Sequence, residues 1–296
     1  MAEALWTRFR EGRGIWLSVP AFVFLTIFFI APMAVLLSFG FTEIERGQVR
    51  EGTFTLKYLT NTLTDDLFWW VWWKSFYIGV LSTLLCFLLA YPLAYVYSNS
   101  GRVMRLLILI LTISPLLTSA IVRTYAWLVI LGGRRGVVNV TLIELGLIDR
   151  PIRMLNTDFA VIMGMTQVHL PFMILPLITV LAARDRNMEA ASLGMGASRI
   201  ATFFKITVPM STPGIVAGLT IVFALSYTNF IIPQLLGGGG FTTLAVQVYE
   251  QIVVILDWGR GAMLALLLLG SCFVFILAIG LAGNRAMRWA EREAAT

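Results

Sequence analysis

The side chains that most often catalyse reactions or bind metals are few in this sequence and lie far apart. The 296 residues include one histidine, His169, and two cysteines, Cys86 and Cys272. A single histidine cannot assemble a metal site, and a packed or hydrogen-bonded interior role suits it better than proton transfer. Both cysteines fall within apolar stretches and lack the spacing of a metal or disulfide framework. We therefore expect no catalytic residues, no metal site and no enzymatic activity.

Three polar residues in one apolar stretch could instead line a path for a solute. Tyr227 and Gln234 are seven residues apart, so a continuous helix would carry them on one face, with Asn229 between them. Hydrogen bonds between neighbouring helices would explain the same residues equally well.

Charged residues in or near the apolar stretches are the other candidate pathway residues. Arg123 lies within such a stretch and is followed by Tyr125 and Trp127. A charge within a membrane span faces protein or water, unless its side chain reaches the headgroups. Glu250 and Asp257 are also seven residues apart, and they could attract a cationic solute or simply be solvated surface charges.

The elements that hold these residues are expected to be membrane-spanning helices. Hydrophobic residues make up 58% of the chain and charged residues only 13%, whereas soluble domains carry about 25% charged residues. The mean hydropathy is +0.85. A helix needs about 20 apolar residues to cross a bilayer, and the stretches that meet this length are 15–39, 72–97, 105–131, 158–182, 211–236 and 261–283. The sequence therefore predicts an all-α polytopic membrane protein with about six transmembrane helices.

The distribution of basic residues predicts the orientation of the chain. With both termini in the cytoplasm, the inner segments carry twelve bases and six acids, and so hold the whole net charge of +6. The positive-inside rule favours this orientation, although Arg134, Arg135, Arg150 and Arg153 lie in the outer loop 132–157. Because the basic charge reflects membrane topology, nucleic acid is not an expected partner.

Two outer segments are long enough to fold. Residues 40–71 are expected to contain a short helix that ends in tryptophans marking a membrane interface, namely Trp69, Trp70, Trp72 and Trp73. A second short helix is expected at 137–147, between turn signals.

The loop 183–209, between the fourth and fifth stretches, carries signals for two short helices. Its capping and turn residues are Asp185 or Asn187 for the first cap, Gly194 and Gly196 for the turn, Ser198 for the second cap and Pro209 for the end. Two capped helices joined by a glycine turn would make a rigid knob. The pattern fits a docking element, and it fits an ordinary interfacial amphipathic segment equally well.

The same loop resembles the EAA loop of permeases from binding-protein-dependent ABC importers. Gly196, Ile206, Val208 and Pro209 match the glycine-then-I-x-L-P part of that motif. The family places a glutamate six residues before the glycine, where this chain has Ala190, with Glu189 one residue earlier.

The resemblance extends to spermidine/putrescine-type permeases over most of the chain. The matching segments are 90–95, 123–127, 146–149, 170–176, 213–218, 243–245 and 257–258. The resemblance implies a type I ABC importer permease fold, with a cytoplasmic segment 1–14, a transmembrane permease domain 15–283 and a cytoplasmic tail 284–296. It also implies a bacterial cytoplasmic (inner) membrane location, with both termini cytoplasmic and lipid around the helices.

The implied partners are a second related permease, two ATPase subunits and an extracytoplasmic solute-binding protein. The chain lacks a G-x-x-x-x-G-K-[ST] phosphate loop, so ATP and Mg²⁺ are expected on the ATPase subunits, with no cofactor in this chain. The resemblance favours a polyamine as the solute, with an opine or another small organic solute as the alternative. A self-powered secondary transporter is the alternative from another class.

The resemblance further implies that the loop 183–209 couples the chain to the ATPase. The residues expected to take part are Glu189, Ala190, Ala191, Ser192, Gly196, Ile200, Phe203, Phe204 and Pro209. Its apolar anchors would be Met195, Ile200, Phe203 and Phe204, which suit a helix laid into a groove.

Overall fold

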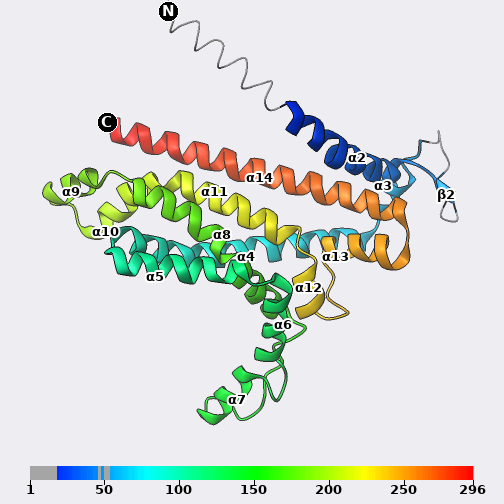
Figure 1. Cartoon of the computed structure of the whole chain (residues 1–296), viewed down its shortest axis with the longest axis horizontal. Helices are drawn as coiled ribbons and strands as arrows, with labels where there is room; N and C mark the ends of the chain where they lie inside the picture. Colours follow the sequence, from blue (N-terminus) through cyan, green and yellow to red (C-terminus); the bar gives the residue numbers. More distant parts are fainter. Residues whose placement is uncertain (1–18, 46–47, 50–53, 296) are drawn as a thin grey trace, which may run out of the picture. The chain divides into compact units, whose positions relative to one another are not determined.

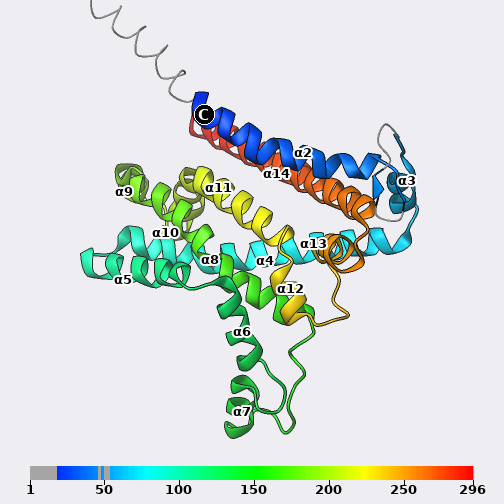
Figure 2. The same cartoon turned by 45° about the vertical axis from the view of Figure 1, so that its right-hand side comes forward.

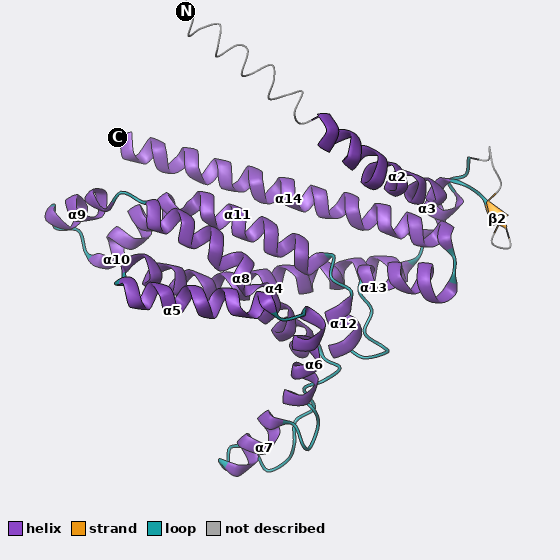
Figure 3. Cartoon of the chain, viewed as in Figure 1, coloured by secondary structure: helices purple, strands orange, loops and turns teal. Residues whose placement is uncertain are grey.

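The computed structural model describes residues 19–45, 48–49 and 54–295, with side chains described for 19–43 and 54–285. The expected N-terminal segment 1–14 lies outside the described residues. The described chain is built almost entirely from helices (Figure 3). Five of them are long and apolar enough to cross a membrane, and a bent pair would make a sixth span.

The elements follow one another in a simple order. The first span, Val19–Phe41, includes the π-helical turn η1 (Thr26–Ile30), α2 (Ala31–Ser38) and the 3₁₀ turn η2 (Phe39–Phe41). A two-stranded antiparallel hairpin, β1 (Ile44–Glu45) and β2 (Gln48–Val49), comes next. The remaining elements are α3 (Lys57–Leu63), α4 (Asp66–Asn99), α5 (Arg102–Ile113), η3 (Ser114–Leu117), α6 (Ala120–Ile130), α7 (Val137–Glu144), α8 (Asp158–Ala183), α9 (Arg186–Gly194), α10 (Arg199–Thr202), η4 (Phe203–Thr207), α11 (Val208–Tyr227), α12 (Ile231–Leu236), α13 (Leu244–Tyr249), η5 (Glu250–Ile255) and α14 (Trp258–Ala295).

Two expected boundaries are wrong. The tryptophan cluster does not end a short helix, because α3 stops at Leu63 and the tryptophans lie within α4, which starts at Asp66. The stretch 211–236 is not one helix, because α11 ends at Tyr227 and α12 begins at Ile231. The short helix expected at 137–147 is confirmed as α7.

The third span is bent. The pair Arg102–Leu117 and Ala120–Ile130 turns by 98° between its two parts. Pro115 lies at the start of the 3₁₀ turn η3, and Thr118 is extended, with φ −104° and ψ 136°. A proline cannot donate the backbone hydrogen bond that would continue the α-helix, so the chain leaves the helix here and restarts.

Two prolines are accommodated by π-helical turns. Pro32 follows η1 and Pro209 follows η4, and in each case the residue before the proline donates to a carbonyl five residues back. Proline has no N–H to donate, and the wider π-helical turn lets the helical path continue past it. Pro209 therefore does not close the loop segment as expected, because the helical path continues from Arg199 to Tyr227.

The described residues form two compact units, of which the first comprises the described part of 19–65 together with 248–267. Within it, the first span meets the start of α14, where the backbone nitrogen of Met263 lies 3.1 Å from where a Cβ on Gly40 would be. The Asp65 carboxylate accepts a hydrogen bond from Arg260 Nη2 at 3.0 Å, which ties the end of α3 to the first turn of α14.

The second unit comprises residues 66–247 and 268–296. Its centre is the set of long helices α4, α8 and α11, which lie side by side in both views (Figures 1 and 2). The short helices α9 and α10 lie at one end of this set and α12 at the other, while α6 and α7 project away from it. The long helices thus connect two ends of the unit.

Small residues let α8 and α11 approach closely. A Cβ on Gly214 would lie 2.9 Å from the Pro176 carbonyl oxygen, and one on Gly218 would lie 2.6 Å from the Met173 sulfur. Glycines four residues apart on one helix face commonly permit such contacts in membranes. Gly214 and Gly218 therefore serve the close packing of these two helices.

Candidate functional site

The first helix of the loop 183–209 is capped at both ends. The Asp185 carboxylate accepts a hydrogen bond from the Asn187 backbone at 2.9 Å, so Asp185 is the N-cap of α9. At the other end, the backbone N–H of Gly196 donates to Leu193 and that of Ala197 donates to Ser192. This pair of bonds is a Schellman turn, and it requires the φ of +87° that Gly196 adopts. Gly196, rather than Gly194, makes the turn.

The second short helix is held against the first. The Ser198 hydroxyl accepts a hydrogen bond from the Ala201 backbone at 3.1 Å and so caps α10, which confirms the expected role. The hydroxyls of Ser192 and Thr202 lie 3.0 Å apart in a buried hydrogen bond between α9 and α10. Two caps and one cross-link make this loop a defined knob rather than a loose connection.

The knob exposes apolar side chains. Met195 is 84% exposed, Ile200 72% and Phe204 64%. Ala190 and Ala191 are exposed as well. Burying apolar surface stabilises an interface, so this face is suited to contact with another protein.

Phe203 points inward, unlike the other expected anchors. Its ring centroid lies 5.7 Å from that of Tyr91 and 5.4 Å from that of Tyr95, both edge-on. Phe203 therefore joins the loop to α4 and is not part of the exposed face.

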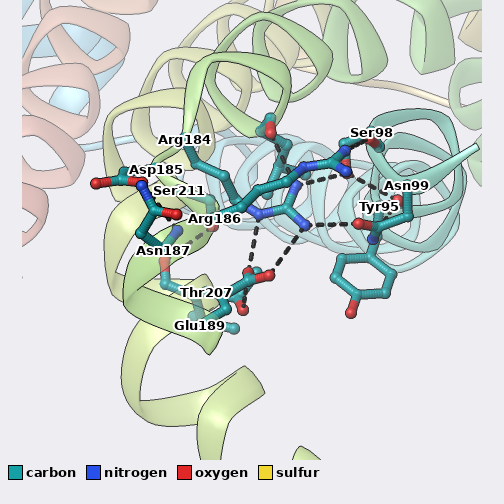
Figure 4. A network of polar contacts seen from close by, with 12 residues as sticks. Tyr95, Ser98, Asn99, Arg184, Asp185, Arg186, Asn187, Glu189, Thr207 and Ser211 are labelled. Carbon is teal, nitrogen blue, oxygen red and sulfur yellow. Dashed lines mark hydrogen bonds and ion pairs between the residues drawn. The ribbon is translucent and has the colours of Figure 1, made fainter. Parts of the chain in front are cut away.

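Glu189 also faces inward, into a network of polar contacts (Figure 4). Its Oε1 accepts hydrogen bonds from Arg184 Nε at 2.8 Å and from Thr207 Oγ1 at 2.6 Å. Burial raises the pKa of the Glu189 carboxyl, but the hydrogen bonds from Arg184 and Thr207 and the charges of Arg184 and Arg186 outweigh this effect. The pKa therefore lies below its ordinary value of 4.5. Glu189 is an ionised brace between α9 and η4.

The three polar residues expected on one helix face are separated. Tyr227 is buried near the end of α11, and its hydroxyl lies 2.8 Å from that of Ser271. The Asn229 side chain accepts a hydrogen bond from the Ile232 backbone at 3.0 Å, at the start of α12. Gln234 lies exposed on α12. The prediction that Tyr227 and Gln234 share one helix face is wrong, because the helix breaks between them.

Arg123 is a charged side chain in an unusual position on α6. Its Nε and Nη1 atoms are buried and have no hydrogen-bond partner among the described residues. Tyr125, two residues on, is 54% exposed, whereas Trp127 packs against the buried cluster around Met165. His169 on α8 has a partner, since its Nδ1 lies 2.8 Å from the Ser226 hydroxyl. The hydrogen-bonded interior role expected for His169 is confirmed.

The two acids near the start of α14 are placed differently from each other. Asp257 accepts a hydrogen bond from the Arg260 backbone at 3.0 Å and so caps α14. Glu250 lies in the π-helical turn η5, and Leu256 between them is left-handed, with φ +64°. A seven-residue spacing therefore does not put these acids on one continuous α-helix.

Two features of the second unit were not predicted from the sequence. Arg184 is one of the twelve bases counted on the inner side, but the residues next to it in the sequence do not predict its hydrogen-bond partners on α4, which lie 85 and 86 residues away. A cavity of about 750 Å³ lies beside α7, and its lining includes Arg134, Arg150 and Arg153. No group of three metal-ligating side chains occurs among the described residues.

Comparison with known proteins identifies the class to which this arrangement belongs. Residues 89–288 match the family model described as "Binding-protein-dependent transport system inner membrane component". The match covers more than half of the chain, so the chain belongs to this family of inner-membrane ABC importer permeases.

The curated relatives include several permeases named for polyamines. The chain is 30% identical over 257 residues to the "Spermidine/putrescine transport system permease protein PotB" of Haemophilus influenzae, covering 86% of this chain and 89% of the relative. It is 32% identical over 238 residues to the protein of the same name from Escherichia coli, covering 80% and 86%. The relatives are permease proteins, so the chain is a transport subunit and not an enzyme.

Solved structures share the fold at lower sequence identity. A chain of a bacterial ABC transporter that imports the acidic polysaccharide alginate superimposes with a TM-score of 0.76 at 17% identity, covering 95% of this chain and 99% of that chain. A chain of the MetNI methionine ABC transporter superimposes with a TM-score of 0.51 at 18% identity, covering 77% and 99%. The fold is that of the type I ABC importer permeases.

Proposed function

We propose that the chain is one of two permease subunits of an ATP-driven importer and that its solute is a polyamine such as spermidine or putrescine. The relatives that carry polyamine names match 80–86% of the chain, so the resemblance involves the helices as well as the loop. The chain would form half of a pathway that opens alternately to the two sides of the membrane.

The single observation that carries the proposal is the exposed knob of the loop 183–209. It is capped at Asp185 and Ser198 and turned at Gly196, and it presents Met195, Ile200 and Phe204 outward. A rigid apolar knob suits a groove on another protein. We assign that groove to an ATPase subunit, which would bring ATP and Mg²⁺.

The remaining partners are a second related permease and an extracytoplasmic receptor that delivers the solute. Both termini and the knob would face the cytoplasm of a bacterium, because the inner segments carry the whole net charge of +6. Labelling of an introduced cysteine at exposed position 187 by an impermeant reagent in intact cells would contradict this orientation.

The pathway residues remain part of the proposal. Arg123 is the strongest candidate, since a charge within a span marks a functional position by default. The exposed Gln234 and the half-buried Glu250 are the other candidates, and neither of them caps a helix.

The proposal is tested by uptake into proteoliposomes. The chain, its second permease and two ATPase subunits are reconstituted, the receptor is added outside, and radiolabelled spermidine is offered with ATP enclosed. Uptake should need every component and ATP hydrolysis, and excess unlabelled putrescine should compete better than an opine. Uptake by the chain alone would contradict the ABC mechanism, and competition by the opine but not by putrescine would contradict the polyamine assignment.

A further inference from the structure

We propose that Arg184 latches the knob directly to the end of α4, so that a push on the knob moves α4 and not only the helices that the loop connects. This inference rests on the proposed function, because it concerns how the knob passes on the work of the ATPase. The loop is joined by the chain to α8 and α11, whereas α4 is reached only through side chains.

The Arg184 side chain is almost fully buried, with 1% of its surface exposed. Every one of its five N–H donors has an acceptor. Nε donates to Glu189 Oε1 at 2.8 Å, Nη1 to Ser98 Oγ at 2.6 Å and Leu181 O at 2.8 Å, and Nη2 to Asn99 Oδ1 at 2.9 Å and Glu189 Oε2 at 3.4 Å. One guanidinium thus joins α9, the end of α8 and the end of α4.

The end of α4 is built to receive positive charge. Its last carbonyls lack partners within the helix and carry partial negative charge. Arg105 Nε donates to the Tyr97 carbonyl at 3.2 Å and Arg105 Nη2 to the Ser98 carbonyl at 3.1 Å. Arg186, at the start of α9, also donates to the Ser98 carbonyl. Figure 4 shows Arg184 and Arg186 converging on this turn from the loop.

The knob side of the latch is fixed as well. Glu189 holds Arg184 from the first turn of α9 and also accepts from Thr207 on η4. The charges of Arg184 and Glu189 are paired in a largely buried site, where removal of one residue would leave the charge of the other without a partner. The latch is therefore expected to stay closed through the transport cycle, as a permanent link rather than a switch.

Arginine suits this position for a geometric reason. Its planar guanidinium directs five donors along fixed directions, whereas a lysine ammonium offers three donors from one atom. A lysine at 184 has three donors for these five acceptor atoms, and all three leave one nitrogen. Arginine is therefore the side chain that can satisfy every acceptor of the latch.

The first experiment measures whether α9 and α4 move as one body. Spin labels are placed at the exposed positions Leu193 on α9 and Val96 on α4, in a chain whose Cys86 and Cys272 are replaced by alanine, within the complete reconstituted importer. The distance distribution should be narrow and should keep the same mean in the nucleotide-free and ATP-bound states. A mean that shifts between these states in the otherwise unchanged chain would overturn the latch.

The second experiment removes only the α4 side of the latch. The double variant Ser98→Ala, Asn99→Ala leaves Arg184 paired with Glu189, so the knob keeps its own bonds. Solute imported per ATP hydrolysed should fall by about five-fold or more, the lower end of usual coupling between sites, and the spin-label distribution should broaden. The conservative pair Ser98→Thr, Asn99→Asp, which keeps both acceptors, should restore the ratio.

A neighbouring residue serves as the matched control. Ser100 follows directly after α4, and its hydroxyl takes no part in the latch, so Ser100→Ala should leave the ratio unchanged. An unchanged ratio in the double variant would overturn the inference. If the knob did not meet the ATPase at all, the ATPase would fail to copurify with the unmodified chain, so failure of the proposed function is distinguishable from failure of the latch.

Discussion

The Thr207 hydroxyl donates a 2.6 Å hydrogen bond to Glu189 Oε1, across 18 residues of sequence. This contact joins the π-helical turn η4 to the first turn of α9. Together with Arg184, it makes ionised Glu189 a structural part of the knob. The family resemblance instead implies that a glutamate of this motif takes part in coupling to the ATPase.

The first prediction concerns the pH dependence of stability. The folded pKa of Glu189 lies below its ordinary value of 4.5, so ionisation stabilises the folded chain above that value, and this stability is lost as the pH falls through the folded pKa. Thermal unfolding of the purified chain and its Glu189→Gln variant should differ by a constant amount above pH 4.5. The difference should shrink at lower pH, and a difference that grows on acidification would contradict the pairing.

The second prediction compares two glycines of the knob. Gly196 has φ +87°, whereas Gly194 does not adopt a positive φ, and both have open space around a would-be Cβ. Gly196→Ala should therefore destabilise the knob by about 1–2 kcal/mol, and the bulkier Gly196→Val should uncouple ATP hydrolysis from uptake. Gly194→Ala should be neutral or stabilising. Equal effects on thermal stability from the two alanine variants would show that backbone strain is not the cause.

The third prediction separates stability from transport at Arg123. Its buried Nε and Nη1 lack partners in the described chain, and an unsatisfied buried polar group costs about 1–3 kcal/mol. Arg123→Met should raise the unfolding temperature of the isolated chain yet reduce uptake by the assembled importer. Arg134 is exposed and lies outside the spans, so Arg134→Met should change neither the unfolding temperature nor the uptake. A less stable Arg123→Met chain would show that the guanidinium has partners after all.

The fourth prediction concerns the packing of α8 against α11. Gly214→Ala would place a Cβ 2.9 Å from the Pro176 carbonyl oxygen, which belongs to the backbone and cannot swing away. Overpacking of this kind costs about 1–3 kcal/mol. Gly270→Ala, with open space around its Cβ, is the matched control and should be tolerated. Both variants can be compared by thermal unfolding in detergent, and equal tolerance would contradict the close contact.

Features that depend on short-range chemistry could be predicted from the sequence. The caps at Asp185 and Ser198 and the turn at Gly196 depend on residues within five positions of one another. The number of spans follows from apolar length alone. The resemblance of the loop to the EAA motif then identified the class.

Features that depend on distant residues or on breaks within apolar stretches could not be predicted. Tyr227 and Gln234 stand in one apolar stretch, but α11 ends at Tyr227 and α12 begins at Ile231, and hydropathy does not report such a break. The bond from Arg184 to Ser98 spans 86 residues. The inward turn of Phe203 depends on Tyr91 and Tyr95 of another helix, so its exposure could not be read from the loop.

Cross-linking from the knob tests the central claim, that the loop 183–209 is where this chain meets the ATPase. A photo-reactive amino acid is introduced at Ile200, 72% exposed on the knob, or at Leu117, 85% exposed at the end of η3. In the complete importer in membranes, irradiation should join position 200 to an ATPase subunit and leave position 117 without that product. An ATPase product from position 117, or none from position 200 in an importer that transports normally, would contradict this account.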